Sequence, residues 1–206
     1  MNRETRVISS REQGWLEDAL AVLRSGGLVA FPTDTVYGLA ALAGLPPAVE
    51  GIFRAKARPR EKSVPVLVAD WPGASGIALP SPAGERLARA FWPGPLTIVL
   101  RRDPQLSEDI WSTGSVGVRA PNHLLALELL RSAGPLATSS ANRSGEVSLC
   151  TASEVSEALD GRIDLIVDGG AAPGGHPSTV VDCMGDSPIL VRAGPVSLGE
   201  IHAVLG

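Results

Sequence analysis

Basic side chains gather in one short stretch of this 206-residue sequence, from Arg54 to Lys62. Five of the 18 lysines and arginines lie there, including both lysines, Lys56 and Lys62. Arginine forks bind phosphate oxygens in pairs, and lysine adds a compact positive charge beside them. Because the net charge of the chain is −4, such a cluster indicates a site for one polyanion and not a uniformly basic surface. A solvated basic turn after a helix is the alternative.

Polar side chains also follow the ends of several expected strands. They are Thr33, Asp34, Thr35, Ser115, Arg119, Ser139, Ser140, Asn142, Ser178, Thr179 and Arg192. In open α/β sheets the ligand crevice lies beyond the strand ends, so this distribution predicts one shared cleft. Taken singly, each of these residue types also closes turns or caps helices.

Other kinds of site find less support. The histidines His123, His176 and His202 stand far apart, and none pairs with a cysteine at the spacing of zinc ligands. Neither G-x-x-x-x-G-K-[ST] nor G-x-G-x-x-G occurs. A serine hydrolase could use the SSAN segment with His176 as base, but the sequence has no G-x-S-x-G elbow. Asp34 as a general base stays open, although an aspartate between two threonines is more often a turn residue.

Apolar periodicity predicts short strands alternating with helices. Strands are expected at residues 28–31, 36–42, 64–68, 96–100, 115–119, 163–167, 178–183 and 189–192, and just before SSAN. Capping boxes are expected to begin three of the helices, at Ser10, Thr151 and Ser197. This continuous alternation predicts a layered α/β sheet with helices packed on it, and the tight turns between some strands predict a mixed sheet.

Length and composition favour one domain, taken as residues 1–206. The isoelectric point of about 5.4 argues against a dedicated nucleic-acid binder. The two cysteines, Cys150 and Cys183, imply no disulfide framework. The first residues lack the apolar core of a signal peptide, and there is no apolar run of about 18 residues. We therefore expect a cytoplasmic protein without a membrane partner.

Seven segments occur in an informative order. They are PTDTVYGL, KARPREKS, FWPGPLT, SVGVRAP, SSANRSG, PSTVVD and ILVRAGP. Together they resemble the YrdC/TsaC family of threonylcarbamoyl-AMP synthases, in its short bacterial form, over roughly residues 12–203. The resemblance implies an α/β fold (α+β in some schemes), the YrdC-like three-layer arrangement. In it a twisted mixed β-sheet is flanked by helices and bears a basic concave cleft.

The resemblance also implies a reaction. L-threonine, bicarbonate and ATP would form threonylcarbamoyl-AMP and pyrophosphate, a nucleotidyl transfer. This would be the first step of N6-threonylcarbamoyladenosine formation at position 37 of tRNAs that read ANN codons. Transient contact with tRNA and with the threonylcarbamoyl-transferase complex would follow. Mg²⁺ is expected with ATP, without a prosthetic group, and catalysis would rest on positioning and charge neutralisation.

Site residues are implied position by position. L-threonine would be bound by Thr35, Arg119, Ser140 and Ser178. ATP would be surrounded by Lys56, Arg58, Lys62, Ser115, Asn142, Thr151 and Arg192, with Lys56 and Arg58 as the catalytic pair. The sequence departs from the family pattern in two places. A histidine common after K-x-R-P is replaced within VPVL, ending at Leu67, and the segment after S-x-N reads SLCT.

Two other interpretations stay open. The chain could be a carbamoyl-adenylate-forming module, like the related domain of hydrogenase-maturation carbamoyltransferases. It could also be a non-enzymatic RNA-binding module that uses the basic cleft. The acidic net charge and the scarcity of aromatic residues speak against the RNA-binding module.

Overall fold

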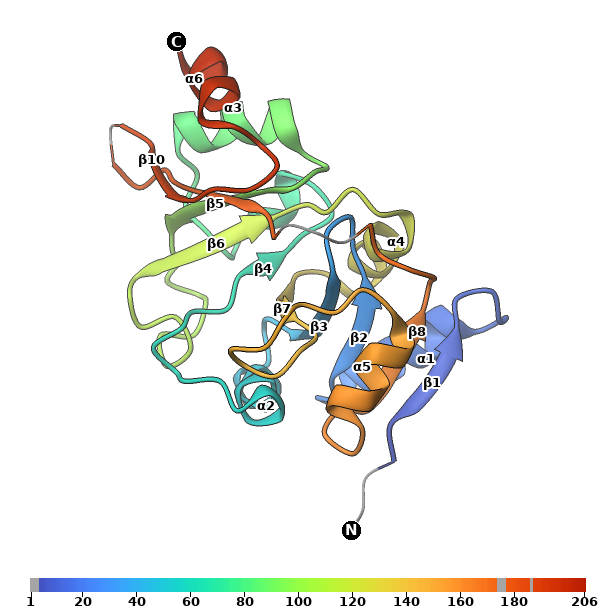
Figure 1. The fold of residues 1–206 in the computed structure, drawn as a ribbon. Helices are drawn as coiled ribbons and strands as arrows, with labels where there is room; N and C mark the ends of the chain where they lie inside the picture. Colours follow the sequence, from blue (N-terminus) through green and yellow to red (C-terminus); the bar gives the residue numbers. More distant parts are fainter. Residues whose placement is uncertain (1–3, 174–176, 186) are drawn as a thin grey trace.

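One mixed β-sheet runs through the molecule (Figure 1). The computed structural model describes residues 4–173, 177–185 and 187–206. The strands in these ranges are β1 (Arg6–Ser9), β2 (Val29–Pro32), β3 (Tyr37–Leu42), β4 (Val66–Leu67), β5 (Leu96–Arg101), β6 (Ser115–Arg119), β7 (Leu136–Ser140), β8 (Leu165–Asp168), β9 (Thr179–Asp182) and β10 (Ile189–Arg192). Their order in the sheet is β1-β8-β2-β3-β7-β4-β6-β5-β9-β10.

Parallel and antiparallel pairs alternate irregularly across this sheet. Strand β8 is parallel to both of its neighbours, β1 and β2, whereas β2, β3 and β7 follow each other antiparallel. Further along, β4 is parallel to β6 and β5 is parallel to β9. The predicted α/β fold with a mixed sheet is therefore confirmed.

Helices cover both faces of the sheet. Those in the described ranges are α1 (Trp15–Arg24), α2 (Pro46–Lys56), α3 (Pro82–Phe91), α4 (Leu124–Ala133), α5 (Ala152–Leu159) and α6 (Leu198–Leu205), with a 3₁₀ turn η1 (Pro72–Ala74). Helices α1 and α4 pack together on one face, over β2 and β8, while α2 and α5 lie on the other. Helices α3 and α6 pack on each other, and α3 covers β5 at the far end of the sheet (Figure 1).

The side-chain alternation of the strands divides the core in two. In β2, Val29 and Phe31 contact the helices α1 and α4, whereas Ala30 faces the side of α2 and α5. In β3, Leu39 belongs to the same half of the core as Ala30, and the next residue, Ala40, belongs to the half on the opposite face of the sheet. Because both faces are covered, these strands are apolar throughout and lack polar alternation. No helix among the described residues is long and apolar enough to cross a membrane.

Two of the three expected capping boxes are confirmed. The hydroxyls of Thr151 and Ser197 each accept the backbone N–H of a glutamate three residues on, and that glutamate bonds back to the cap. The expected capping box at Ser10 is wrong, because α1 begins only after Gly14, whose φ is 89°. The left-handed φ of Gly14 carries the chain into the helix without a side-chain cap.

Strand β1 was not expected from the sequence. It has four residues, RVIS, and only Ile8 among them is buried. It forms one edge of the sheet and pairs only with β8. A strand so short and so exposed carries little apolar alternation, which explains why periodicity does not detect it.

A pair of leucines on α4 tests the packing of this helix on the sheet. Leu129 is fully buried, whereas Leu124 is 86% exposed at the start of the same helix. Leu129→Ala removes buried methyl groups and leaves a cavity, so we expect the free energy of unfolding to fall by about 2–5 kcal/mol. For Leu124→Ala we expect a change of less than about 0.5 kcal/mol. Chemical denaturation measures both, and equal losses would contradict the packing described.

Candidate functional site

A cavity of about 270 Å³ opens where the β2–β3 turn meets the ends of β6 and β7 and the segment before β9. Its walls come from Thr33, Thr35, Val36, Tyr37, Gly38, Arg58, Pro65, Leu67, Thr97, Arg119, Thr138, Ser139, Ser140, Ser148, Pro177, Ser178 and Arg192. Among them are six of the residues predicted to bind threonine or ATP, namely Thr35, Arg58, Arg119, Ser140, Ser178 and Arg192. The fold thus brings together side chains that lie far apart in the sequence.

The β2–β3 turn is shaped by the hydroxyl of Thr33. This hydroxyl donates to the carbonyl of Val36 at 2.7 Å and accepts the backbone N–H of Thr35 at 3.2 Å. Such hydroxyl-to-backbone bonds hold a turn in one conformation. The Thr35 hydroxyl lies 3.0 Å from that of Thr33, and both residues line the cavity. Thr35 is therefore fixed at the cavity wall by its neighbour.

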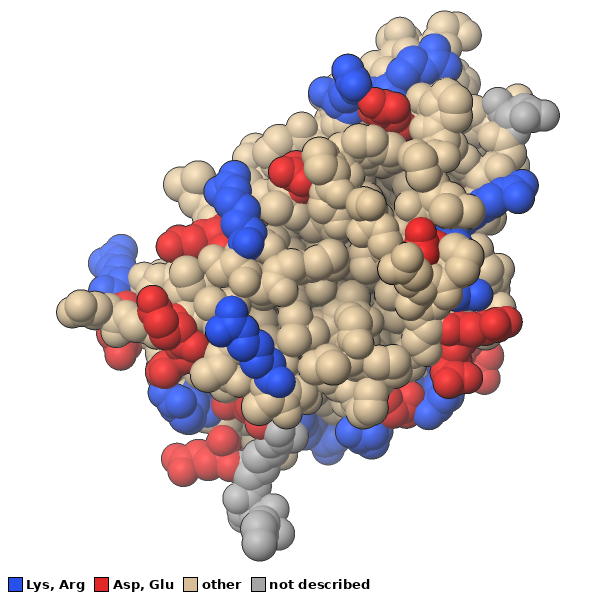
Figure 2. Space-filling view, turned by 180° about the vertical axis from the view of Figure 1, so that it is seen from behind, with Lys and Arg blue, Asp and Glu red and all other residues tan. Residues whose placement is uncertain are grey.

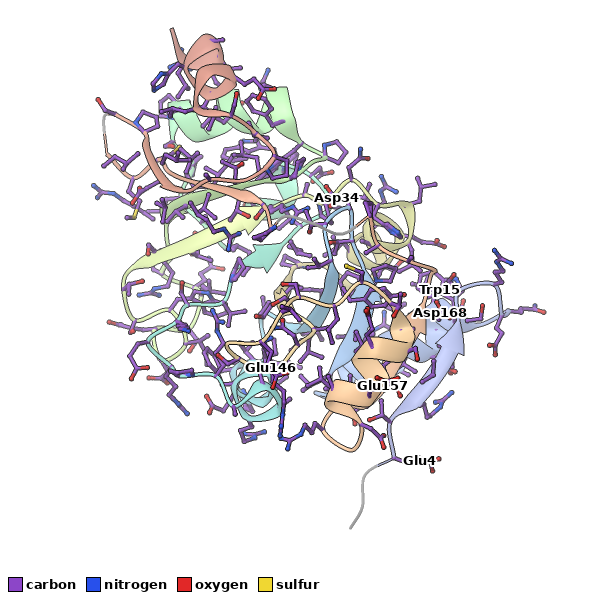
Figure 3. The ribbon with its side chains drawn as sticks, viewed as in Figure 1. Glu4, Trp15, Asp34, Glu146, Glu157 and Asp168 are labelled. Carbon is purple, nitrogen blue, oxygen red and sulfur yellow. The ribbon has the colours of Figure 1, made fainter. Side chains whose placement is uncertain are left out.

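Arg119 ends β6 and is buried, with 6% of its surface exposed. Its Nε donates to the carbonyl of Gly94 at 3.0 Å and its Nη1 to the Thr35 hydroxyl at 3.2 Å. Its Nη2 forms an ion pair with Asp34, which lies at the tip of the β2–β3 turn (Figure 3). Burial lowers the pKa of Arg119 and the Asp34 carboxylate raises it, and an arginine stays charged under both influences.

Ser178, which precedes β9, is held by two side chains. Its hydroxyl lies 2.7 Å from that of Thr97, and its carbonyl accepts from Nε and Nη2 of Arg192 at 3.1 and 2.8 Å. Nη2 of Arg192 also lies 3.1 Å from the Ser178 hydroxyl. Gly194 passes so close that a Cβ there would lie 2.4 Å from the backbone nitrogen of Thr179. Only glycine allows the backbone at position 194 to come this close to Thr179. The close approach of the two segments keeps Arg192 beside Ser178.

Tyr37, the first residue of β3, joins three segments around the cavity. Its hydroxyl donates to the carbonyl of Gly170 at 2.7 Å, in the glycine-rich loop after β8. Its backbone N–H donates to Leu149 and its carbonyl accepts from Ala141, both in the region after β7. Burial, followed by the nearby Asp168 carboxylate, raises the pKa of Tyr37 to about 12. The phenol therefore stays protonated and remains a donor at neutral pH.

Lys56 ends α2 and is 1% exposed. Its Nζ donates to the carbonyls of Ser140 and Asn142 and lies 3.4 Å from the Asn142 side-chain oxygen. The Asn142 amide nitrogen donates in turn to the carbonyls of Arg143 and Glu146, at 2.9 and 2.7 Å. An ammonium group has three donors, and Ser140 and Asn142 together supply three acceptors. Lys56 and Asn142 therefore hold the loop after β7 in its conformation, and neither residue is among those that line the cavity.

Arg58 is the member of the basic stretch that reaches the cavity. Its Nε donates to the carbonyl of Lys62 at 3.1 Å and its Nη2 to that of Ser63 at 2.8 Å. These bonds fold residues 58–63 into a turn after α2, in which the Lys62 side chain is exposed. Burial lowers the pKa of Arg58.

Two further residues assigned to ATP lie outside the cavity. Ser115 stands at the start of β6, opposite to the end that carries Arg119, and its hydroxyl lies 3.0 Å from that of Thr113. Thr151 caps α5, and its hydroxyl is engaged by Glu154. Contacts of Ser115, Thr151, Lys62, Asn142 and Lys56 with ATP stay predictions.

Several cavity residues were not among the expected ligands. Thr97 and Thr138 lie within strands, and Ser148 lies on the loop after β7. Thr97 carries the single hydroxyl of the mostly apolar run LTIVLR, and this was the signal that could have indicated it as a cavity residue. Leu67, at the position where the family histidine is missing, is 5% exposed and lines the cavity. The wall that it forms with Pro65 is apolar.

Among the described residues that line the cavity, the charged ones are three arginines, Arg58, Arg119 and Arg192. On the face seen in Figure 2, basic and acidic side chains are interspersed along the edge and form no large basic patch. A broader basic cleft stays a prediction. Within the described ranges, no three His, Cys, Asp or Glu side chains gather as metal ligands would. His176, considered as a hydrolase base, lies outside the described residues.

The pH dependence of stability tests the burial of Lys56. Burial lowers the pKa of Lys56 from 10.5 to about 8, with a further decrease caused by Arg58 and an opposing increase caused by Glu146. Between these two pH values the unfolded chain binds more protons than the native protein, so the free energy of unfolding should rise with pH. We expect a rise on the order of 3 kcal/mol relative to Lys56→Met, measured by urea denaturation from pH 7 to 10.5. Parallel curves for the two proteins would contradict this.

Comparisons with known proteins agree with this geometry. A family model described as "Telomere recombination" (Sua5_yciO_yrdC) matches residues 21–194. A Bacillus subtilis protein named threonylcarbamoyl-AMP synthase is 42% identical over 195 residues, which are 93% of this chain but 56% of the relative. A Mycobacterium tuberculosis (H37Rv) protein named putative threonylcarbamoyl-AMP synthase is 41% identical over 190 residues, 91% of this chain and 88% of the relative.

Solved structures support the same conclusion. Sua5 of P. abyssi, crystallised with L-threonine, superposes with a TM-score of 0.92 at 40% identity, covering 98% of this chain and 61% of that protein. E. coli YciO gives a TM-score of 0.87 at 24% identity, covering 96% of this chain and 99% of that protein, a likeness of fold alone. The resemblance inferred from the seven segments is thereby confirmed. Since the family model spans most of the chain and two relatives are more than 40% identical to it, the chain belongs to the Sua5/YciO/YrdC family.

Proposed function

We propose that this chain is a threonylcarbamoyl-AMP synthase, which joins L-threonine, bicarbonate and ATP and releases pyrophosphate. The observation that carries the proposal is the cavity in which Thr35, Arg119 and Ser178 converge from distant parts of the chain. The names of the 42% and 41% identical relatives support it, as does the P. abyssi Sua5 structure with L-threonine. The chain spans little more than half of the B. subtilis relative, so the activity of the whole relative is carried over only as this proposal.

The cavity suits an amino acid. Its volume of about 270 Å³ lies just below the range of roughly 300–1,000 Å³ found for drug-sized ligands. Arg119 would bind the α-carboxylate of threonine through a bidentate pair of hydrogen bonds. The hydroxyls of Thr35, Ser140 and Ser178 would bind the amine and the side-chain hydroxyl. The apolar wall at Leu67 would face the threonine methyl group.

ATP would extend from this cavity towards the basic turn. Arg58 lines the cavity on the side of that turn, and Arg192 lines it beside Ser178. These arginines would hold the phosphates and neutralise the charge of departing pyrophosphate. Mg²⁺ would arrive on the phosphates of ATP and neutralise part of their charge, because no carboxylate is among the described residues of the cavity lining. Lys56 would support the loop that carries Ser140 and Asn142.

The chemistry needs no nucleophile from the protein. The threonine amine and bicarbonate would form a carbamate with loss of water. A carbamate oxygen would then attack the α-phosphorus of ATP, and pyrophosphate would leave. The contribution of the protein is to hold the reactants in line and to stabilise charge.

The product would serve tRNA modification. A labile acyl adenylate needs an acceptor, and the resemblance implies adenosine 37 of tRNAs that read ANN codons. We propose transient contact with tRNA and with the transferase complex, and a cytoplasmic location that follows from this role.

Pyrophosphate release with each substrate omitted in turn tests the function. We expect release only when L-threonine, bicarbonate, ATP and Mg²⁺ are all present, together with an AMP adduct seen by mass spectrometry. Release without threonine would indicate a carbamoyl-adenylate-forming module instead. No release from folded protein, together with salt-dependent tRNA binding, would favour an RNA-binding module.

Substitution of Arg58 tests the phosphate site. Arg58→Ala removes a charge at the cavity, and we expect kcat/KM for ATP to fall by about 100-fold or more, as for loss of a group that stabilises transition-state charge. Arg54→Ala is the matched control, because Arg54 lies four residues earlier, in α2, and is exposed outside the cavity. Equal effects of the two substitutions would refute a specific role for Arg58.

Substitution of Ser178 tests the threonine pocket. Ser178→Ala leaves the Thr97 hydroxyl without its partner in the cavity wall and removes a ligand for threonine. We expect KM for L-threonine to rise by about tenfold while KM for ATP changes by less than about twofold. A parallel rise of both constants would show that Ser178 does not belong to the threonine pocket.

A further inference from the structure

One carboxylate beside the cavity has no role in the chemistry described so far. Asp34 forms an ion pair with Arg119, and the side chains are only 12% and 8% exposed, respectively. Arg119 lines the cavity, whereas Asp34 is absent from its lining. Asp34 therefore bonds to a residue of the cavity wall without being part of the lining itself.

The contacts of Arg119 leave a defined set of donors. A guanidinium group carries five N–H groups. Among the described residues, Gly94 accepts from Nε, Thr35 from Nη1 and Asp34 from Nη2. One N–H on each terminal nitrogen is left by these three contacts. Two such donors on adjacent nitrogens match the two oxygens of a carboxylate.

We propose that Asp34 is a positioning residue for substrate recognition. Its carboxylate fixes the rotation of the Arg119 guanidinium so that the two remaining N–H groups face the cavity as a fork for the α-carboxylate of threonine. Gly94 and Thr35 are neutral acceptors, so among the three the bond to Asp34 is the one in which both partners are charged, and it holds the guanidinium group most firmly. This inference rests on the proposed function and deepens it.

Charge balance explains why a carboxylate suits this position. A buried arginine without a counter-charge is costly, so Asp34 makes the empty site stable. Asp34 and Arg119 together are neutral, and Arg192 lines the same cavity with a further positive charge. The positive charge of Arg192 would balance the negative charge of the threonine α-carboxylate. Asp34 thus orients Arg119 without competing with the substrate inside the cavity.

Discrimination between L-threonine and L-threoninol tests this role. Threoninol has a hydroxymethyl group in place of the carboxylate, so it makes no use of the arginine fork. We expect Asp34→Asn to weaken threonine binding by calorimetry, and to raise KM for threonine, by about tenfold, with KM for ATP within about twofold. Threoninol binding should change little, so the preference for threonine should shrink by about tenfold. Asp34→Glu, which restores the charge, should recover part of the preference.

Controls separate positioning from a general structural effect. Glu85→Gln removes an ion pair on the exposed surface of α3 and should leave both ligands unaffected. Asp34→Asn keeps an oxygen acceptor, so it should fold even where Asp34→Ala does not. Equal losses of affinity for threonine, threoninol and ATP in Asp34→Asn, or an unchanged preference for threonine over threoninol, would overturn the inference about Asp34. The proposed function would still stand if the wild-type protein turns over its substrates. Absence of threonine binding and of turnover in the wild-type protein would overturn both.

Discussion

Two buried cations join the segments that surround the cavity. Arg119 and Lys56 are 6% and 1% exposed, and burial of a charge is tolerated only where hydrogen-bond partners replace water. The partners of Arg119 come from the turn before β5 and from the β2–β3 turn. Those of Lys56 come from Ser140 at the end of β7 and from Asn142 in the loop that follows. Because each cation must keep its acceptors, Arg119 holds the end of β6 to two turns, and Lys56 holds the end of α2 to the region around the end of β7.

The order of the strands brings these cations to the same place. Strand β7 pairs antiparallel with both β3 and β4, so Ser140 at the end of β7 lies beside Gly38 at the start of β3. Strand β4 pairs in parallel with β6, which places Leu67 beside Arg119. Helix α2 packs on β3 from one face, which places Lys56 under the loop after β7 (Figure 1). The parallel pairing of β5 with β9 carries Ser178 to the opposite wall. The mixed sheet is thus the scaffold on which a polar cavity is assembled.

The character of the cavity agrees with chemistry that depends on positioning. Hydroxyls and arginines are the main polar groups among the described residues that line it, and none of those residues carries a carboxylate. The hydroxyls of Thr33 and Thr97 restrain Thr35 and Ser178. A preorganised site of this kind stabilises developing charge without reorganising during the reaction. The chain belongs to the same family as P. abyssi Sua5, which was crystallised with L-threonine, and the proposal of an amino-acid substrate draws on that relationship.

The sequence by itself determined most elements and the identity of the family. The short apolar runs of the strands, the capping residues Thr151 and Ser197, and the seven motifs are local signals, readable without knowledge of the fold. Only the tertiary structure decided which polar residues share the cavity. It placed Lys56 under a loop, Thr97 in the cavity wall and β1 at an edge. These outcomes depend on contacts between residues that are often more than 80 positions apart, such as Lys56 with Ser140. The order of the strands in the sheet creates such contacts, and the periodicity of the sequence does not encode that order.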